Sequence, residues 1–149
     1  MLDRVARLVP GLWAGVLLCI ALIATPAAFG ALASQEAGRV VARIFANEAG
    51  LSLALGMALV LWERRRAAAP DGTARLSAPM LLALGAIFCT VAGYYGLQPM
   101  MQAARAGQGA WTFGQLHAVS LALFGLKTAL VLVLAWRAGS ALSPAGPSS

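Results

Sequence analysis

Glu48 and His117 are ionisable residues that lie near the starts of long apolar segments. An ionisable side chain in such a position is a candidate for binding a ligand, because it is costly there without a partner. A carboxylate accepts hydrogen bonds and an imidazole donates or accepts them, so the two together can hold a small polar solute or a metal ion. Hydroxyl and amide groups near the ends of the apolar segments could complete such a site: Thr25, Asn47, Tyr94, Gln98 and Ser120. We treat these residues as one candidate polar cluster.

Four apolar segments, at about 8–30, 44–62, 77–98 and 115–136, must position the cluster. Hydrophobic residues make up 60% of the chain and charged residues 11%, which leaves too little polar surface for a soluble domain. About 20 apolar residues cross a hydrocarbon core as a helix, and these segments lack the alternation of barrel strands. The sequence therefore predicts an all-α polytopic membrane protein. Its four-helix transmembrane bundle forms one domain over 1–138, and a disordered cytoplasmic tail follows at 139–149.

The basic residues predict the orientation. One side of the predicted bundle carries Arg4, Arg7, the connection 64–75 with four arginines, and Arg137, whereas the other carries only Arg39, Arg43 and Arg105. Because cytoplasmic loops are enriched in Lys and Arg, both termini are expected in the cytoplasm, and the location is the bacterial inner membrane. The competing interpretation makes the first segment a cleaved signal peptide, because Ala31-Leu32-Ala33 resembles a cleavage site. The apolar run is long for a signal peptide, which favours a retained helix.

The alternating direction of the spans suggests a common depth for the cluster. Spans one and three would end at Thr25 and Tyr94, and spans two and four would begin at Glu48 and His117, so all four residues are expected in the outer leaflet. The alternative is that the tyrosines form an aromatic belt while the ionisable residues face headgroup water. Lys127 lies about 15 Å deeper than His117 along its helix, so we expect it to snorkel or to bond carbonyl groups rather than to pair with Glu48.

The connections and the small residues carry structural predictions. Residues 33–44 have an apolar stripe and predict a short amphipathic interfacial helix between spans one and two. Pro26 should kink the first span, and Pro70-Asp71-Gly72 predicts a turn in the cytoplasmic connection. Cys19 and Cys89 are expected to serve packing only. Several glycines are expected to mark close helix contacts: Gly50, Gly56, Gly93, Gly96 and Gly125.

Several short motifs resemble one known family. They are Ala37-Gly38-Arg39 followed by Phe45, Pro26 near the end of span one, Gln98-Pro99-Met100, and the run from Phe113 through His117 to Ser120, which reads Phe-x-x-Leu-His-x-x-Ser. The sequence is similar over about 8–136 to the family called domain of unknown function 4149, which is related to transmembrane protein 205 of animals. The resemblance implies a bacterial four-helix membrane protein without an established activity. By analogy with the animal relatives it suggests a role in stress or toxicant resistance.

Three classes of function are weighed. The first is a non-enzymatic membrane protein that binds or passes a small solute or a metal at the polar cluster. The second is a haem-binding or copper-binding redox subunit with His117 and Met100 or Met101 as ligands, although a lone histidine disfavours it. The third, an enzyme, is not expected, because no catalytic carboxylate pair or activated nucleophile is present at helical spacing. We expect no resident cofactor and no nucleic-acid partner, with lipid and a second membrane subunit, including another copy of the chain, as partners.

Overall fold

The computed structural model describes residues 2–67 and 76–140. Four helical rods in this part of the chain are long and apolar enough to cross a membrane: Ala6–Ala31, Ser34–Ala67, Ala78–Arg105 and Phe113–Ser140. Large apolar side chains such as Leu22, Phe88 and Trp136 are exposed on their outer faces, as expected for surfaces that contact lipid. The predicted all-α, multi-pass membrane architecture is therefore confirmed.

The first and third rods each contain a π-helical turn. The first rod consists of α1 (Leu2–Cys19), η1 (Ile20–Ala24) and α2 (Thr25–Ala31), and the third of α4 (Ala78–Thr90), η2 (Val91–Gly96) and α5 (Leu97–Arg105). Pro26 and Pro99 follow shortly after the two π turns. A proline removes one helical hydrogen bond and crowds the preceding turn, and a π turn is one of the local adjustments that accommodate it. The disturbance expected at Pro26 thus takes the form of a π turn.

The second and fourth rods are uninterrupted: α3 runs from Ser34 to Ala67 and α6 from Phe113 to Ser140. The separate interfacial helix expected over 33–44 is not present, because these residues form the first turns of α3. Its polar residues Glu36, Arg39 and Arg43 continue a helix that becomes apolar further along. The predicted turn at Pro70-Asp71-Gly72 and most of the predicted tail lie outside the described residues.

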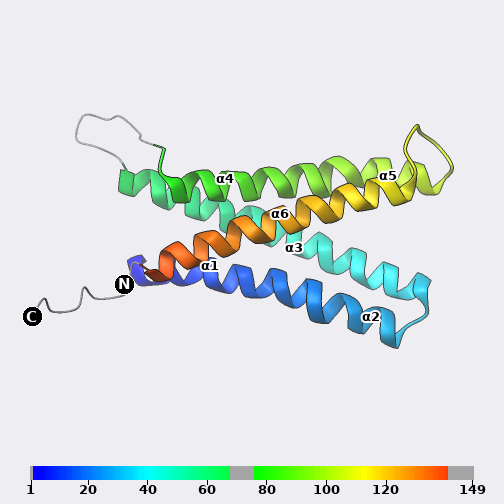
Figure 1. The fold of residues 1–149 in the computed structure, drawn as a ribbon, viewed down its shortest axis with the longest axis horizontal. Helices are drawn as coiled ribbons and strands as arrows, with labels where there is room; N and C mark the ends of the chain where they lie inside the picture. Colours follow the sequence, from blue (N-terminus) through cyan, green and yellow to red (C-terminus); the bar gives the residue numbers. More distant parts are fainter. Residues whose placement is uncertain (1, 68–75, 141–149) are drawn as a thin grey trace, which may run out of the picture.

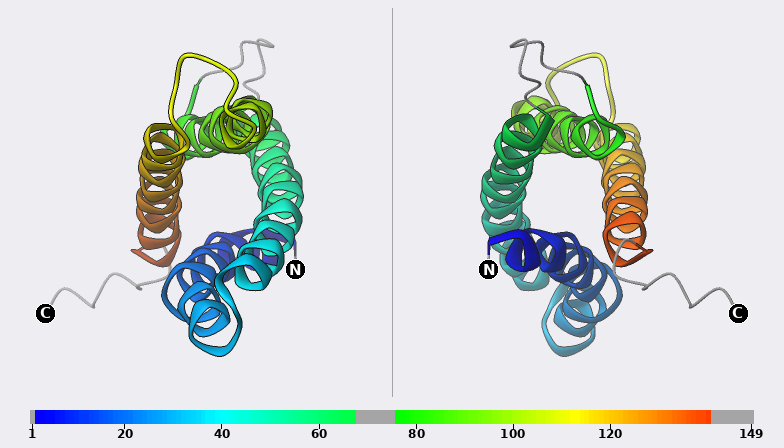
Figure 2. Two further views of the ribbon diagram at one scale, coloured as in Figure 1. Left: turned by 90° about the vertical axis from the view of Figure 1, so that its right-hand side faces the viewer. Right: turned by 90° about the vertical axis from the view of Figure 1, so that its left-hand side faces the viewer.

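The four rods form a ring when viewed along the bundle (Figure 2). Neighbours around the ring are α1 and α6, α6 and α4, α4 and α3, and α3 and the first rod, so that α3 and α6 face each other across the centre. The start of α1 and the end of α6 lie at the same end of the bundle (Figure 1). We call this end, which carries Arg7, Arg64, Arg65, Arg66 and Arg137, the arginine end. The opposite end, with the α2–α3 and α5–α6 connections, is the hairpin end.

The apolar core lies in the half of the bundle nearer the arginine end. Trp13 and Leu17 of α1 pack there with Leu59, Met80, Ala83 and Val131 from the other rods. Small residues allow close approach at two of the predicted glycines: a Cβ at Gly56 would lie 2.7 Å from the Ile87 side chain, and one at Gly93 would lie 3.1 Å from Leu123. Gly50 and Gly125 have no neighbouring atom within 4 Å, so the close contacts expected at these two positions are wrong within the described chain.

Candidate functional site

The centre of the bundle holds an ion pair between the two rods that face each other. Lys127 Nζ of α6 lies 2.7 Å from Glu48 Oε1 and 2.8 Å from Glu48 Oε2 of α3, so the ammonium group donates to both carboxylate oxygens. Glu48 is 4% exposed and Lys127 is 3% exposed. Two opposite charges thus neutralise each other inside the protein and connect α3 to α6 across the ring.

A chain of hydrogen bonds extends the ion pair to the first rod. Ser52, one turn after Glu48 on α3, donates its hydroxyl proton to Glu48 Oε1. Trp13 Nε1 of α1 donates to the same hydroxyl oxygen at 2.9 Å. The serine is thus both acceptor and donor, and the indole N–H, the hydroxyl, the carboxylate and the ammonium of this network each have a partner. The site combines residues from three rods into one satisfied polar network.

The walls of the site are aromatic and apolar. The Phe124 ring, on α6, lies with its centroid 4.8 Å from Lys127 Nζ, and Phe45 of α3 contacts that ring edge-on. A cation over an aromatic face is attracted by the ring quadrupole, so the Phe124 ring is a further partner of the ammonium group. Cys89 of α4 is buried and within electrostatic range of Lys127, so the third rod also faces the site. Because both charged side chains are buried from water, the charges of Glu48 and Lys127 are stabilised by this network of contacts.

The prediction that Lys127 does not pair with Glu48 is wrong. It placed Glu48 in the first turn of span two, but α3 begins at Ser34, so Glu48 lies about 21 Å along the helix from its start. Lys127 lies at the same depth, about 21 Å from the start of α6 at Phe113. Both helices begin at the hairpin end, as the alternating direction of the spans predicts, and the two residues are equally far along them, so they lie at one depth.

His117 does not contact Glu48 in this arrangement. It is exposed on the first turns of α6, and its ring stacks on Phe113 with centroids 5.7 Å apart. Arg105 of α5 lies 4.5 Å from the centroid of the same Phe113 ring. The histidine therefore belongs to a surface stack at the hairpin end, and the expected cluster is not brought together around its two ionisable members.

The other residues of the predicted cluster are distributed along the half of the bundle nearer the hairpin end. Ser120 donates to the Gly93 carbonyl at 3.3 Å and so connects α6 to η2. Tyr94 packs edge-on against Tyr95, and Asn47 is exposed. Thr25 Oγ1 is buried without a hydrogen-bond partner in the described residues, and Gln98 is half-buried. Among these residues only Ser120 makes a polar contact between rods.

The candidate metal or haem ligands of the second class are not clustered. Met100 is 41% exposed on α5, and within 2–67 and 76–140 no group of three or more His, Cys, Asp or Glu side chains could hold a metal ion. The family-motif residues fall mostly near the hairpin end as well: Pro26, Gly38, Arg39, Phe45, Pro99, Phe113, His117 and Ser120. The residues that do form a charged site, Lys127, Ser52 and Trp13, were not proposed as its members from the sequence.

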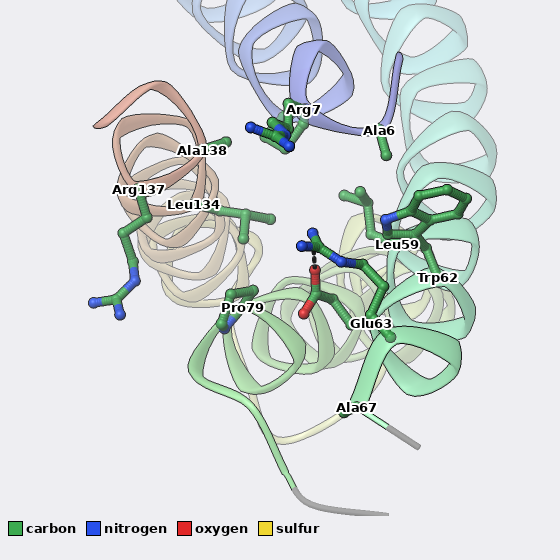
Figure 3. A pocket seen from close by; sticks show the side chains of 12 residues that line it. Ala6, Arg7, Leu59, Trp62, Glu63, Ala67, Pro79, Leu134, Arg137 and Ala138 are labelled. Carbon is green, nitrogen blue, oxygen red and sulfur yellow. Dashed lines mark ion pairs between the residues drawn. The ribbon is translucent and has the colours of Figure 1, made fainter. Parts of the chain in front are cut away.

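A cavity of about 680 Å³ opens between all four rods at the arginine end (Figure 3). We call it the vestibule. Its lining comprises Ala6, Arg7, Pro10, Leu59, Trp62, Glu63, Arg66, Ala67, Pro79, Leu134, Arg137 and Ala138. Leu59 lies two turns, or about 10 Å, after Ser52 on α3, and Leu134 lies the same distance after Lys127 on α6. The vestibule thus extends toward the ion pair and is separated from it by core residues such as Trp13 and Val131.

Comparison with known proteins gives one match. The family described as Domain of unknown function (DUF4149) matches residues 8–110, which include three of the four rods and Glu48 but not Lys127. No curated protein and no solved structure matches the chain.

Proposed function

Because the chain belongs to the DUF4149 family, whose function is unknown, we propose a function from its structure: a membrane protein that binds a small anionic solute and passes it across the bilayer. In this proposal the Glu48–Lys127 pair is the gate. The observation that carries the proposal is that pair, since it is buried at the middle of the bundle and joins rods on opposite sides of the ring. Ionisable residues at this depth are costly and mark solute or ion pathways in membrane proteins.

The pair is suited to gating because its two charges are each other's partners. Moving α3 away from α6 leaves a carboxylate and an ammonium unpaired in an apolar interior, which costs several kcal/mol. An anion that approaches Lys127 supplies a replacement partner, so it binds the separated state better than the closed one. A ligand shifts a conformational equilibrium only through such a difference in affinity. The solute itself would therefore open the gate.

The charge of the vestibule favours an anion over a cation. Three arginines from three rods line it, with Glu63 as its one acidic lining residue. Glu63 accepts a hydrogen bond from Ser77 at 3.1 Å and lies 3.9 Å from Arg66 NH1, so its charge is already compensated. A basic, partly enclosed surface raises the local concentration of anions. By the positive-inside rule this end faces the cytoplasm of a bacterial inner membrane, and the passage of an unwanted anion outward would fit a role in toxicant resistance.

Solute-driven currents test the proposal. Purified protein is reconstituted in liposomes on a solid-supported membrane, and the current is recorded after concentration jumps of chloride, phosphate or benzoate. We expect a saturable current for at least one anion, lost in Lys127→Met and retained in the control Arg105→Met, whose arginine stacks on Phe113 at the far end. The proposal fails if wild-type protein gives no current with any of the three anions, or if Lys127→Met gives the wild-type current.

A further inference from the structure

The vestibule has the composition of a binding site for an amphipathic molecule. Its volume of about 680 Å³ is in the range of sites for small organic ligands, roughly 300–1,000 Å³. Apolar side chains, including Leu59, Leu134 and Pro10, form its deeper walls. Guanidinium groups occupy the other part of the lining. A ligand that fits both parts carries an anionic head and an apolar body.

Of the arginines in the lining, Arg7 is the one best placed to bind an anion. Arg7, on the α1 wall, lies across the vestibule from Glu63, whose ion pair is with Arg66 (Figure 3). Arg7 and Arg137 make no ion pair with a residue of the described ranges, and the side chain of Arg137 points away from the middle of the cavity. Arg7 is therefore the group placed to meet an anionic head. A guanidinium pairs with carboxylate or phosphate oxygens through two parallel hydrogen bonds.

A hydrogen-bond donor without a partner lies in the α3 wall of the vestibule. Trp62 Nε1 is buried and makes no hydrogen bond within the described part of the chain, and its ring stands beside Leu59 on the α3 side (Figure 3). An indole N–H that is shielded from water and unpaired is unfavourable, because it has lost its hydrogen bond to water and gained none in return. A ligand oxygen that displaces the Leu59 side chain would satisfy it.

We infer that the vestibule binds an amphipathic anion, a phosphate or carboxylate on an apolar body, through Arg7 and Trp62. The inference deepens the proposed function, since the vestibule leads toward the gate, but it concerns binding alone. Two sources have this chemistry: a soluble organic anion from the aqueous phase and an anionic phospholipid of the surrounding bilayer. In either case the head would lie at the arginine end and the apolar body against the leucines.

Calorimetric titration of the full chain in phosphatidylcholine nanodiscs tests the site, with phenyl phosphate as the probe. Inorganic phosphate supplies the head alone and benzyl alcohol the body alone. We expect phenyl phosphate to bind more tightly than either, and Arg7→Gln to weaken it about tenfold, as the loss of a charged hydrogen bond of about 1.5 kcal/mol implies. The matched control Arg105→Gln should leave the affinity unchanged. Trp62→Phe, which removes only the N–H, should weaken binding about threefold or more.

The two sources are separated by repeating the titration in nanodiscs that contain phosphatidylglycerol. Loss of phenyl phosphate binding there supports the site with lipid as its ligand, and unchanged binding supports it with a soluble anion. The inference is overturned if phosphate alone binds as tightly as phenyl phosphate, if no probe binds, or if Arg7→Gln and Arg105→Gln have equal effects. These outcomes are distinct from failure of the gate, because Lys127→Met should abolish current without changing phenyl phosphate affinity.

Discussion

Removing one member of the Glu48–Lys127 pair should destabilise the protein far more than removing both. At 2.7 Å and an effective dielectric constant of about 20, the attraction between the two charges is roughly 6 kcal/mol, and desolvation of the charges offsets much of it. Lys127→Met leaves the Glu48 carboxylate with only the Ser52 hydroxyl. Glu48→Gln leaves the ammonium over the Phe124 ring. Each single change should therefore cost about 3–5 kcal/mol.

The double variant Glu48→Gln, Lys127→Met contains no uncompensated charge, and its cost should be below about 2 kcal/mol, because well-packed neutral replacements of buried pairs are often nearly neutral. The free energy of unfolding is measured for all four proteins by SDS titration in mixed micelles. The expected coupling energy between the two sites is then at least about 4 kcal/mol, beyond the usual range for residues in contact. If the unfolding free energies lost in the two single variants sum to the loss in the double variant, the two charges do not interact, and the proposal that they form a gate is wrong.

Three further outcomes follow from the packing and the charge distribution. Gly56→Leu should strongly lower the melting temperature in detergent, because a Cβ at this position meets the Ile87 side chain. Gly125→Leu should have little effect, because nothing lies within 4 Å of a Cβ there. Equal effects of the two substitutions would contradict the assigned helix contacts. His117→Ala should add independently to Glu48→Gln in unfolding free energy, and a large coupling between them would restore the predicted outer cluster. A reporter enzyme that works only in the cytoplasm should be active when fused after Ser149, and one that works only in the periplasm should be inactive there; the opposite result would show that the predicted orientation is wrong.

The spans could be predicted from the sequence because their signal is simple. Length and hydropathy alone determine that four segments must be helices in lipid, and the structure has them. The start of α3 could not be placed in the same way. Its first turns contain Glu36, Arg39 and Arg43, which look like a surface segment, so the apolar run appeared to begin ten residues after Ser34.

The error in the start of α3 displaced Glu48 by about 15 Å, and the candidate site was displaced with it. One signal in the sequence did favour the true arrangement. Glu48 and Lys127 carry opposite charges within apolar segments, and in lipid such charges are each other's cheapest partners. A pairing argument from charge would have been sounder than one from estimated depth. Trp13 and Ser52 gave no comparable signal, because a single indole or hydroxyl is common in helices that pack in membranes.

The π turn at Ile20–Ala24 changes how the first span should be aligned with that of its relatives. A π turn amounts to one residue inserted into an α-helix, and each inserted residue rotates everything beyond it by about 100° around the helix axis. Residues before Cys19 and after Thr25 that a regular helical wheel places on one face are therefore on different faces here. A relative with a regular α-helix through this point would need one residue fewer to present the same faces to the other rods. A single-residue gap between positions 20 and 24 is thus a structural equivalence, and alignments that forbid it would compare residues facing lipid with residues facing the bundle.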